Sequence, residues 1–441
     1  MNRKKIFLLN ILLTLFFNAS FAQQTSYKFD FGPGKTAKGY LNILPGTQYE
    51  EGKKYGFDFD SNVEGMNHAG KNALTTDGVK SEKPFYFSVA VSEGNYQVTV
   101  TLGDEKEPTL TTVKAESRRL MLENVKTRAG QFLTKTFIVN IKNRNITGGQ
   151  VVSLKLRELT KLDWDDKLTL EFDGKTALAA LEIKRVEDQI TVFLAGNSTV
   201  VNQEDEPWAS WGQMIPRFFK PGVAIANHAE SGLTLGSFIG SKRLAKVLNV
   251  MKPGDYLFVE FGHNDQKDKG VNDGAYKSYT ERLKTFIAEA KKKGGIPVIV
   301  TSTSRRSFDS TGKVQNTLGD FPNAARKVAK DENVALIDLN AMTAQLFNAL
   351  GEEESKKALV HYPANSYPGQ DKPLADNTHF NPYGAYEIAQ CVILGIKDQK
   401  LGLMKFLVDD LPDFNPSKPD DPSVWKWPES PKSSLVKPDG N

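Results

Sequence analysis

The pattern of apolar residues changes character near Gln189, and this change divides the chain into two parts of different architecture. Before Gln189, apolar and polar residues alternate with a period of two, which is typical of strands with one buried face. After it, short apolar runs alternate with segments of helical periodicity, which is typical of a parallel sheet covered by helices. We therefore predict one domain over residues 24–187 and a second over residues 190–410.

The first part is predicted to be an antiparallel β-sandwich. Residues 85–91 and 96–102 each alternate apolar with polar side chains, and a Glu93-Gly94-Asn95 turn lies between them. We expect these two runs to pair as a half-buried hairpin. Further strands are expected at residues 132–141, 151–156, 168–172 and 178–183. Several short strands separated by Gly and Asn turns favour a sandwich.

The second part is predicted to be a parallel sheet with covering helices. Its strands are expected at residues 190–195, 223–226, 256–261, 296–301 and 335–339. A helix is expected over residues 276–293, where apolar side chains share one face, and another after Pro382, because proline suits the first helical turn. Residues 411–441 are rich in proline and are predicted to form an irregular tail, with Trp425 and Trp427 packed on a domain surface.

The first 22 residues are predicted to be a secretory signal peptide. They begin with three basic residues, continue with an apolar run over residues 6–17, and end on the small-x-small pattern Ser20-Phe21-Ala22. The apolar run is short for a membrane span. We expect an exported chain, periplasmic or extracellular, that is not held at a membrane after cleavage.

Charge and cysteine content exclude several classes of function. The chain has 57 Lys and Arg against 53 Asp and Glu, and no long basic run. Binding to nucleic acid or to an anionic membrane is therefore not indicated. Cys391 is the only cysteine, which excludes an intrachain disulfide and a cysteine-based metal site.

Four polar clusters mark the candidate site. They lie at residues 196–199, 227–232, 262–265 and 376–379; the first three directly follow predicted parallel strands, and the fourth precedes the final helix. In an open parallel sheet, ligands bind at the carboxyl ends of the strands, where the loops converge. We therefore expect the four clusters to meet at one edge of the sheet.

These clusters contain the groups that serine catalysis needs. The hydroxyl of Ser198 requires a nearby base, and His379 can serve if a carboxylate such as Asp376 orients it. An oxyanion that forms during acyl transfer needs fixed donors. The candidates are the N–H of Ser198, the N–H of Gly232 and the side-chain amide of Asn264. This chemistry requires no metal and no cofactor.

The order of these motifs resembles the four blocks of the SGNH, or GDSL-like, hydrolases, and the resemblance covers residues 190–399. The blocks Asn-His-Ala-Glu-Ser-Gly, Gly-His-Asn-Asp and Asp-Asn-Thr-His-Phe-Asn look most like those of rhamnogalacturonan acetylesterases. The family implies a flavodoxin-like three-layer domain and hydrolysis of acetyl esters on an acetylated pectic polysaccharide or oligosaccharide, without a metal. It also implies Ser198 as nucleophile, His379 as base, Asp376 as its orienting acid, and Gly232 and Asn264 as oxyanion donors.

The chain departs from the family in two places. Asn197 stands where an Asp precedes the nucleophile, which removes a charge near Ser198. Residues 233–236 lack the arginines expected in the fungal enzymes, which leaves open another acetylated glycan such as xylan. The first domain resembles galactose-binding or other carbohydrate modules, from its Phe29-Asp30-Phe31-Gly32 opening. It either binds sugar or braces the second domain.

Two functions of other classes remain open. A metallophosphoesterase is suggested by Gly-His-Asn-Asp, although the chain has only five histidines and His68 lies in the first domain. A non-catalytic carbohydrate-binding protein is suggested by the sandwich. Ser198, Asp376 and His379 argue against it.

Three further residues are candidates for substrate binding. Arg305 and Arg306 follow the strand predicted at residues 296–301, and a guanidinium matches the carboxylate of a uronate with two parallel hydrogen bonds. Trp208 could line a sugar subsite at the start of the helix after the nucleophile loop, although core packing explains most of that helix. His263 and Asp265 are interpreted as residues that hold the Asn264 loop.

Overall fold

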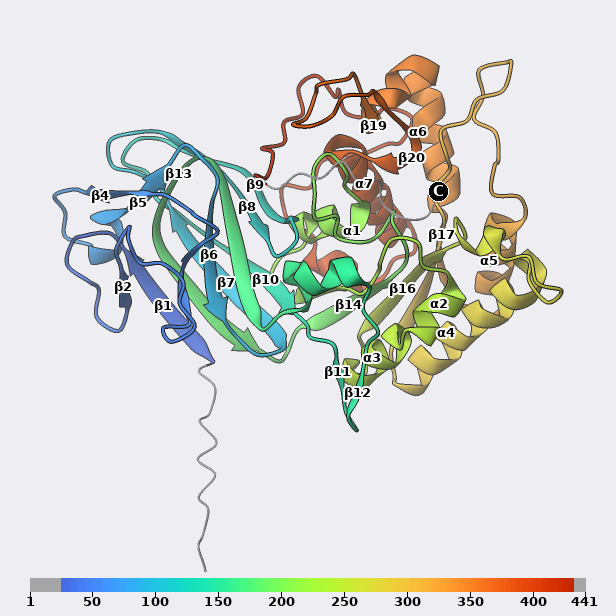
Figure 1. Ribbon diagram of the computed structural model, residues 1–441, viewed down its shortest axis with the longest axis horizontal. Coiled ribbons are helices and arrows are strands. Elements are labelled where there is room, and N and C mark those ends of the chain that lie inside the picture. The colour runs from blue at the N-terminus through green and yellow to red at the C-terminus, as the bar shows by residue number, and fades with distance from the viewer. Residues whose placement is uncertain (1–24, 432–441) are drawn as a thin grey trace, which may run out of the picture.

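The structure, a computed structural model, describes residues 25–431. The predicted signal peptide lies outside the described residues, as do the tail residues 432–441. Figure 1 shows the strands up to β10 (Leu133–Ile141), together with β13 (Lys167–Val186), gathered in a twisted sandwich, and beside it a parallel sheet covered by helices. The two predicted architectures, a β-sandwich followed by a parallel α/β domain, are therefore confirmed.

The long strand β13 organises the sandwich. Its first half pairs with β6 (Phe85–Ala90) and β8 (Thr109–Ala115), and its second half pairs with β1 (Ser26–Phe31) and β7 (Gly94–Leu102), all antiparallel. The register shifts between Leu178 and Ala180. One strand thus takes part in both layers of the sandwich. The other strands of the sandwich are β2 (Leu41–Ile43), β3 (Tyr55–Asp58), β4 (Glu64–Asn67), β5 (Asp77–Ser81), β9 (Arg119–Thr127) and β10 (Leu133–Ile141). The strands β11 (Asn145–Ile146) and β12 (Gln150–Val151) form a separate two-stranded sheet.

The predicted hairpin of residues 85–91 and 96–102 is wrong in its pairing. Both strands exist, but β6 pairs with β3 and β13, whereas β7 pairs with β10 and β13. Alternation along a strand shows which side chains are buried, but it does not identify the neighbouring strand. The two strands predicted at residues 168–172 and 178–183 are parts of the single strand β13.

The strand predicted at residues 151–156 is also wrong. Only Val151 belongs to a strand, and the chain continues into two 3₁₀ turns, Leu156–Thr160 and Leu162–Trp164. The stretch from 155 to 164 contains the charged residues Lys155, Arg157, Glu158, Lys161 and Asp163. Its side chains bind the second domain, as described below, so tertiary contacts override the local strand preference.

Aromatic rings fill the core of the sandwich. Phe87 lies at its centre, with ring centroids 5.1 Å from Phe29, 5.2 Å from Phe31 and 5.5 Å from Phe57, each in an edge-to-face arrangement. Phe85 stacks on Phe172 of β13 at 5.0 Å. Such pairs stabilise beyond the burial of their area, so these rings tie β1, β3, β6 and β13 together.

The second domain contains a five-stranded parallel sheet in the order β15-β14-β16-β17-β18. The first two strands in the chain are swapped in space, which is the flavodoxin-like order. All five predicted strands are present. They are β14 (Ile190–Ala195), β15 (Val223–Asn227), β16 (Tyr256–Phe261), β17 (Ile296–Thr301) and β18 (Ala335–Ile337).

Helices cover both faces of this sheet, which gives three layers. Because side chains of a strand alternate between faces, Val192 and Leu194 pack on one side and Phe193 and Ala195 on the other. The first side is covered by α1 (Trp211–Met214), α6 (Leu339–Glu354) and α7 (Pro382–Asp398). The second is covered by α2 (Leu235–Gly240), α3 (Arg243–Val250), α4 (Thr280–Lys292) and α5 (Phe321–Asp331).

The predicted helices at residues 276–293 and after Pro382 are present with small changes. The first begins as a π turn at Ala275–Tyr279 before α4. The second is α7, whose N-terminus is capped by the side chain of Asn381, which accepts from Gly384 N at 3.0 Å. Cys391 is buried on α7, and burial raises the pKa of its thiol.

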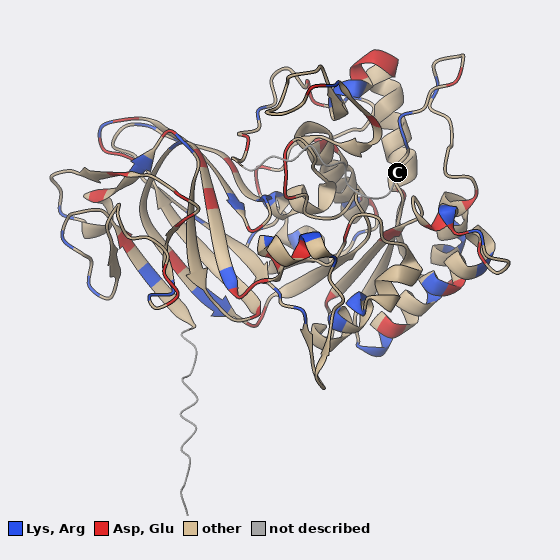
Figure 2. Cartoon of the chain, in the orientation of Figure 1, with Lys and Arg blue, Asp and Glu red and all other residues tan. Residues whose placement is uncertain are grey.

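Figure 2 shows that acidic and basic residues occur along both domains, in line with their near balance in the sequence. None of the helices within residues 25–431 combines the length and the hydropathy that a membrane-spanning helix requires.

The irregular tail connects the two domains. Trp425 and Trp427 stack with centroids 6.1 Å apart, and Trp425 contacts Tyr386 of α7 at 5.3 Å. The indole N–H of Trp427 donates to Glu206 at 2.8 Å, and Lys114 of the sandwich lies 4.4 Å above its ring. Two tryptophans thus fix the tail on a surface that both domains share.

Replacing Trp427 by Ala should lower the free energy of unfolding by about 2 kcal/mol, because a partly buried ring and a hydrogen bond to a buried carboxylate are lost together. The control is Val424→Ala, a change at a neighbouring side chain that is 70% exposed. Thermal and denaturant unfolding of the three proteins test this. Equal midpoints for the Trp427→Ala protein and the wild type would show that the tail contributes nothing to stability.

Candidate active site

The structure brings together all four polar clusters predicted from the sequence. Ser198, Gly232 and Asn264 follow β14, β15 and β16, which are neighbours in the sheet, so their loops emerge at the same edge. His379 comes from β20 (Leu374–Phe380), which pairs with β19 (Leu359–Tyr362) outside the main sheet. The imidazole of His379 nevertheless reaches Ser198.

Ser198, His379 and Asp376 form one chain of hydrogen bonds. His379 Nε2 lies 2.9 Å from Ser198 Oγ, and His379 Nδ1 lies 2.8 Å from Asp376 Oδ2. All three residues are buried. Burial by itself would raise the pKa of Asp376, but hydrogen bonds and the charge from His379 hold it well below its ordinary value. Asp376 is therefore an ionised carboxylate that fixes a proton on Nδ1 and leaves Nε2 to accept from the serine.

A local turn allows Asp376 and His379 to meet. Residues three apart on a strand point to opposite faces, so a regular strand would separate the two side chains. Here Asp376 Oδ1 accepts from the N–H of Thr378 at 2.9 Å and of His379 at 3.0 Å, which curls the chain. The register of β19 and β20 is irregular at this point. The sequence indicated a loop before the last helix, whereas the structure has a distorted strand.

Buried polar contacts hold the nucleophile loop. Asn197 Oδ1 accepts from the N–H and the hydroxyl of Thr199, at 3.2 and 3.0 Å. An amide oxygen thus supplies the acceptor that a carboxylate could supply at this position. Thr199 also donates to Glu260 at 2.8 Å, and the indole of Trp211 donates to the same carboxyl at 2.6 Å. Burial raises the pKa of Glu260 to about 7, although these donors oppose the rise.

The three predicted oxyanion donors lie in adjacent loops. Within residues 25–431, no group accepts from the N–H of Ser198 or of Gly232. Gly232 has φ +78°, a left-handed conformation that favours glycine. The amide of Asn264 donates to Leu233 O at 3.2 Å, and its oxygen accepts from Lys267 at 3.3 Å. Asn264 is therefore held against the Gly232 loop with its N–H₂ group toward it.

His263 and Asp265 flank Asn264 and are buried on either side of it. Burial lowers the pKa of His263 to about 3, which keeps the ring neutral. Asp265 accepts from the N–H of Leu235 at 2.9 Å, at the N-terminus of α2. In the part of the chain that the structure describes, no three His, Cys, Asp or Glu side chains are grouped so that they could hold a metal ion.

Two of the three candidate substrate-binding residues are buried. Arg306 is 8% exposed, and its guanidinium donates to Ser355, to Asn377 and to the carbonyl of Glu352. Trp208 is 3% exposed and packs in the core. Arg306 is bonded to Asn377 of strand β20, next to Asp376, and Trp208 is buried to the same degree as Ser198. Substrate-binding roles for Arg306 and Trp208 therefore stay predictions.

Arg305 has a different environment. Its side chain is half-buried, and its guanidinium lies 3.5 Å from the carbonyl of His263 and 3.5 Å from Thr317. It thus extends over the Asn264 loop. Arg305 is the one of the three candidates that the structure leaves at a partly open surface near Ser198.

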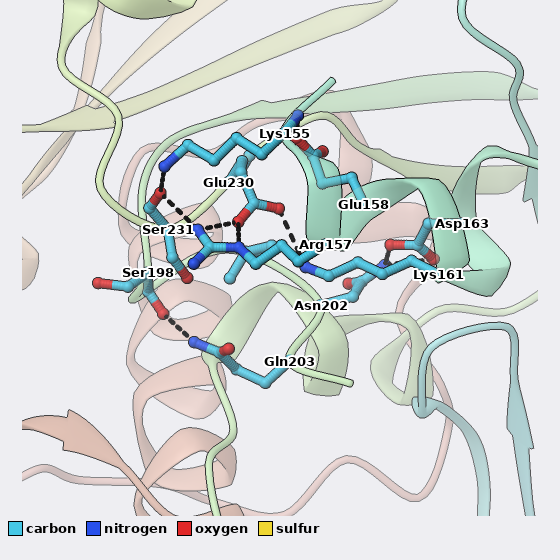
Figure 3. A network of polar contacts seen from close by, with 12 residues as sticks. Lys155, Arg157, Glu158, Lys161, Asp163, Ser198, Asn202, Gln203, Glu230 and Ser231 are labelled. Atoms are coloured by element: carbon cyan, nitrogen blue, oxygen red, sulfur yellow. Dashed lines mark hydrogen bonds and ion pairs between the residues drawn. The ribbon is translucent and has the colours of Figure 1, made fainter. Parts of the chain in front are cut away.

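Sequence reasoning missed a group of charged residues from the first domain. Figure 3 shows Lys155 and Arg157, at the start of the first 3₁₀ turn, extending toward Glu230 and Ser231, which directly precede Gly232. Arg157 donates to Glu230 at 2.6 Å, and Lys161 does so at 3.0 Å. Glu230 is 69 and 73 positions away from these partners. No local pattern in the sequence could have indicated such pairs.

Comparisons with known proteins match each domain. Residues 194–385 match the GDSL-like Lipase/Acylhydrolase family, and residues 27–149 match the Beta-agarase/YXIM esterase-like, galactose-binding domain-like family. The chain is 42% identical to rhamnogalacturonan acetylesterase RhgT of Bacillus subtilis (strain 168), over 50% of this chain and 94% of that protein.

Two further proteins of Bacillus subtilis (strain 168) are similar. The chain is 26% identical to the uncharacterized esterase YxiM, over 87% of this chain and 93% of that protein, which includes both domains. It is 32% identical to the probable rhamnogalacturonan acetylesterase YesY, over 50% of this chain and 98% of that protein. The similarity to both acetylesterases spans about half of this chain, and the similarity to YxiM spans most of it.

The raised pKa of Glu260 predicts a pH-dependent stability. Its carboxyl titrates near pH 7 in the folded protein and near its ordinary value of 4.5 when unfolded, so the folded state binds this proton more tightly. Stability from this group is therefore lost as the pH rises from about 4.5 to about 7. We expect the thermal midpoint of the wild type to fall over this range relative to that of Glu260→Gln, which stays neutral. Parallel midpoint curves from pH 4 to 8 would contradict the shifted pKa.

Proposed function

Since the chain belongs to the GDSL-like lipase/acylhydrolase family, we propose that it hydrolyses acetyl esters on a pectic polysaccharide such as rhamnogalacturonan. The observation that carries the proposal is the continuous chain of hydrogen bonds from Asp376 through His379 to Ser198. The similarity to proteins named rhamnogalacturonan acetylesterases supports the substrate class. An exported location, periplasmic or extracellular, follows from the expected signal peptide and suits a polymeric substrate.

The first half of the proposed reaction forms an acyl-enzyme. Ser198 Oγ attacks the acetyl carbonyl while its proton passes to Nε2 of His379, and Asp376 stabilises the imidazolium that forms. The carbonyl oxygen becomes an oxyanion, which the N–H groups of Ser198 and Gly232 and the amide of Asn264 stabilise. The protonated His379 then gives its proton to the departing sugar oxygen as the carbon–oxygen bond breaks.

The second half releases acetate. A water molecule gives a proton to His379 Nε2 and attacks the acetyl group on Ser198, which forms a second oxyanion in the same place. The proton returns to Ser198 Oγ as its bond to the acetyl carbon breaks. Every proton in this cycle moves through His379, so the orientation that Asp376 imposes on the imidazole serves both halves.

Replacing Ser198 by Ala should lower kcat by about 10⁶-fold, because both halves of the reaction require the hydroxyl. Acetate release from acetylated pectins, xylans and mannans measures this. The pectic substrates should react fastest. Undiminished release by the Ser198→Ala protein would refute the serine mechanism, and a faster reaction on xylan would change the substrate class but not the reaction.

Asn264→Ala should lower kcat by roughly 10²-fold with a smaller change in KM, because an oxyanion donor acts mainly in the transition state. Asp376→Asn should lower kcat by about 10⁴-fold, since the imidazolium loses its counter-charge. Steady-state kinetics on p-nitrophenyl acetate test both. If either variant retains the wild-type kcat, the role assigned to that residue is wrong.

Arg305 is proposed to contact the carboxylate of a galacturonate unit. Arg305→Ala should raise KM on acetylated uronate polymers and leave KM on p-nitrophenyl acetate unchanged, because the small ester carries no carboxylate. Arg306→Ala is the contrasting variant: its guanidinium holds strand β20 next to Asp376, so kcat should fall on both substrates. An equal loss on both substrates for Arg305→Ala would assign it a structural role instead.

A further inference from the structure

The two 3₁₀ turns of residues 155–164, here called the bridging segment, lie against the loop that carries Gly232 (Figure 3). The segment belongs to the first domain, between β12 and β13. Two of its side chains, Lys155 and Arg157, contact the backbone of the loop directly. The bridging segment is therefore one place where the sandwich contacts the candidate site.

Lys155 and Arg157 both donate to the same carbonyl. Lys155 Nζ lies 2.6 Å from Ser231 O, and Arg157 Nη2 lies 3.1 Å from it. This carbonyl and the N–H of Gly232 belong to one planar trans peptide unit, so they point in opposite directions. Two donors that fix the direction of the carbonyl therefore also fix the direction of the Gly232 N–H.

Two positive charges at a carbonyl oxygen also strengthen the N–H at the other end of the peptide. Hydrogen bonds in a series polarise one another, and the effect is larger where the surroundings are buried. Ser231 is 2% exposed. The Gly232 N–H is thus a better donor to a developing oxyanion than an isolated peptide N–H would be.

Ion pairs with the buried residues Glu230 and Arg243 hold the bridging segment in this position. Arg157 donates to Glu230 through Nε at 2.9 Å and Nη2 at 2.6 Å. Burial would raise the pKa of Glu230, but the charges of Lys161, Arg157 and Arg243 lower it, so the carboxylate is ionised. Next to Arg157, Glu158 accepts from Arg243 of α3 at 2.7 Å. Arg157 and Glu158, which are adjacent in the chain, thus pair with Glu230 and Arg243 of the second domain.

We propose that Lys155 and Arg157 are positioning residues of the oxyanion site: they orient and polarise the Ser231–Gly232 peptide so that its N–H donates to the oxyanion on the substrate. The inference rests on the proposed function, because the role of Lys155 and Arg157 is defined by the oxyanion that ester hydrolysis forms. It makes the sandwich a part of the active site. Esterase activity then depends on two side chains outside the family match, which begins at residue 194.

The decisive variant is Lys155→Met, in the full chain. It removes the charged donor and keeps the length of the side chain. Loss of an oxyanion donor costs roughly 10²- to 10³-fold in kcat, so a donor that is misaligned should cost about tenfold, with KM on p-nitrophenyl acetate little changed. Lys155→Arg restores a charged donor and should restore most of kcat. Lys135→Met, the same chemical change on the exposed face of β10, serves as the control.

A second measurement separates positioning from folding. A boronic acid that adds to Ser198 Oγ forms a tetrahedral adduct with an oxygen in the oxyanion site. The inhibition constant of the boronic acid should rise in Lys155→Met by the same factor by which kcat/KM falls. The thermal midpoint of Lys155→Met should equal that of Lys135→Met. The double variant Lys155→Met/Arg157→Met should lower kcat further, to about the level of a lost donor.

Each outcome decides between the two proposals. If Lys155→Met keeps the kcat of Lys135→Met, or if Lys155→Arg fails to restore a lost kcat, the positioning role is wrong and the proposed function stands. A fall in kcat that only follows a fall in the thermal midpoint, with unchanged boronic acid affinity, likewise overturns it. If the wild type releases no acetate from any ester, the proposed function fails first and this inference fails with it.

Discussion

The structure depends on charged side chains that are buried at the boundary of its two domains. Glu230 and Arg243 belong to the α/β domain, and their partners Arg157, Lys161 and Glu158 belong to the sandwich. Removing one partner of a buried ion pair costs about 3–5 kcal/mol, because the other charge is left without compensation. Each domain therefore carries buried charges that pair with charges of the other, and the loop before Gly232 is contacted by residues of both.

The sandwich also contacts the loop that carries the nucleophile, through Arg118. Arg118, in the turn between β8 and β9, forms an ion pair with Glu206 and donates to the carbonyls of Gln203 and Trp208. Gln203 in turn donates to the carbonyl of Ser198 at 2.9 Å. The sandwich thus contacts the loops after β14 and after β15, which carry the nucleophile and one oxyanion donor. Only the loops that carry Asn264 and His379 are held mainly within the α/β domain.

The sequence allowed prediction of what depends on local pattern. Parallel strands align their carboxyl ends, so the positions of Ser198, Gly232 and Asn264 after apolar runs were enough to bring them together. A local sequence pattern does not indicate which strands pair or which distant charged residues are buried together. The hairpin of β6 and β7 was therefore predicted wrongly, and the contacts of residues 155–161 were missed. The motif identified the Asp376–His379 pair, but the sequence did not predict the distorted strand that carries both residues.

Arg305 and Arg306 show why composition near a site does not identify a substrate contact. The two residues have the same chemistry and follow the same strand, β17. The guanidinium of Arg306 donates to Ser355, to Asn377 and to the carbonyl of Glu352. The side chain of Arg305 instead extends over the loop of Asn264. A guanidinium has five donors in a fixed fork, so the acceptors that the folded chain supplies decide whether any remain for a ligand. Those acceptors come from residues 12 to 71 positions away, which only the tertiary structure brings together.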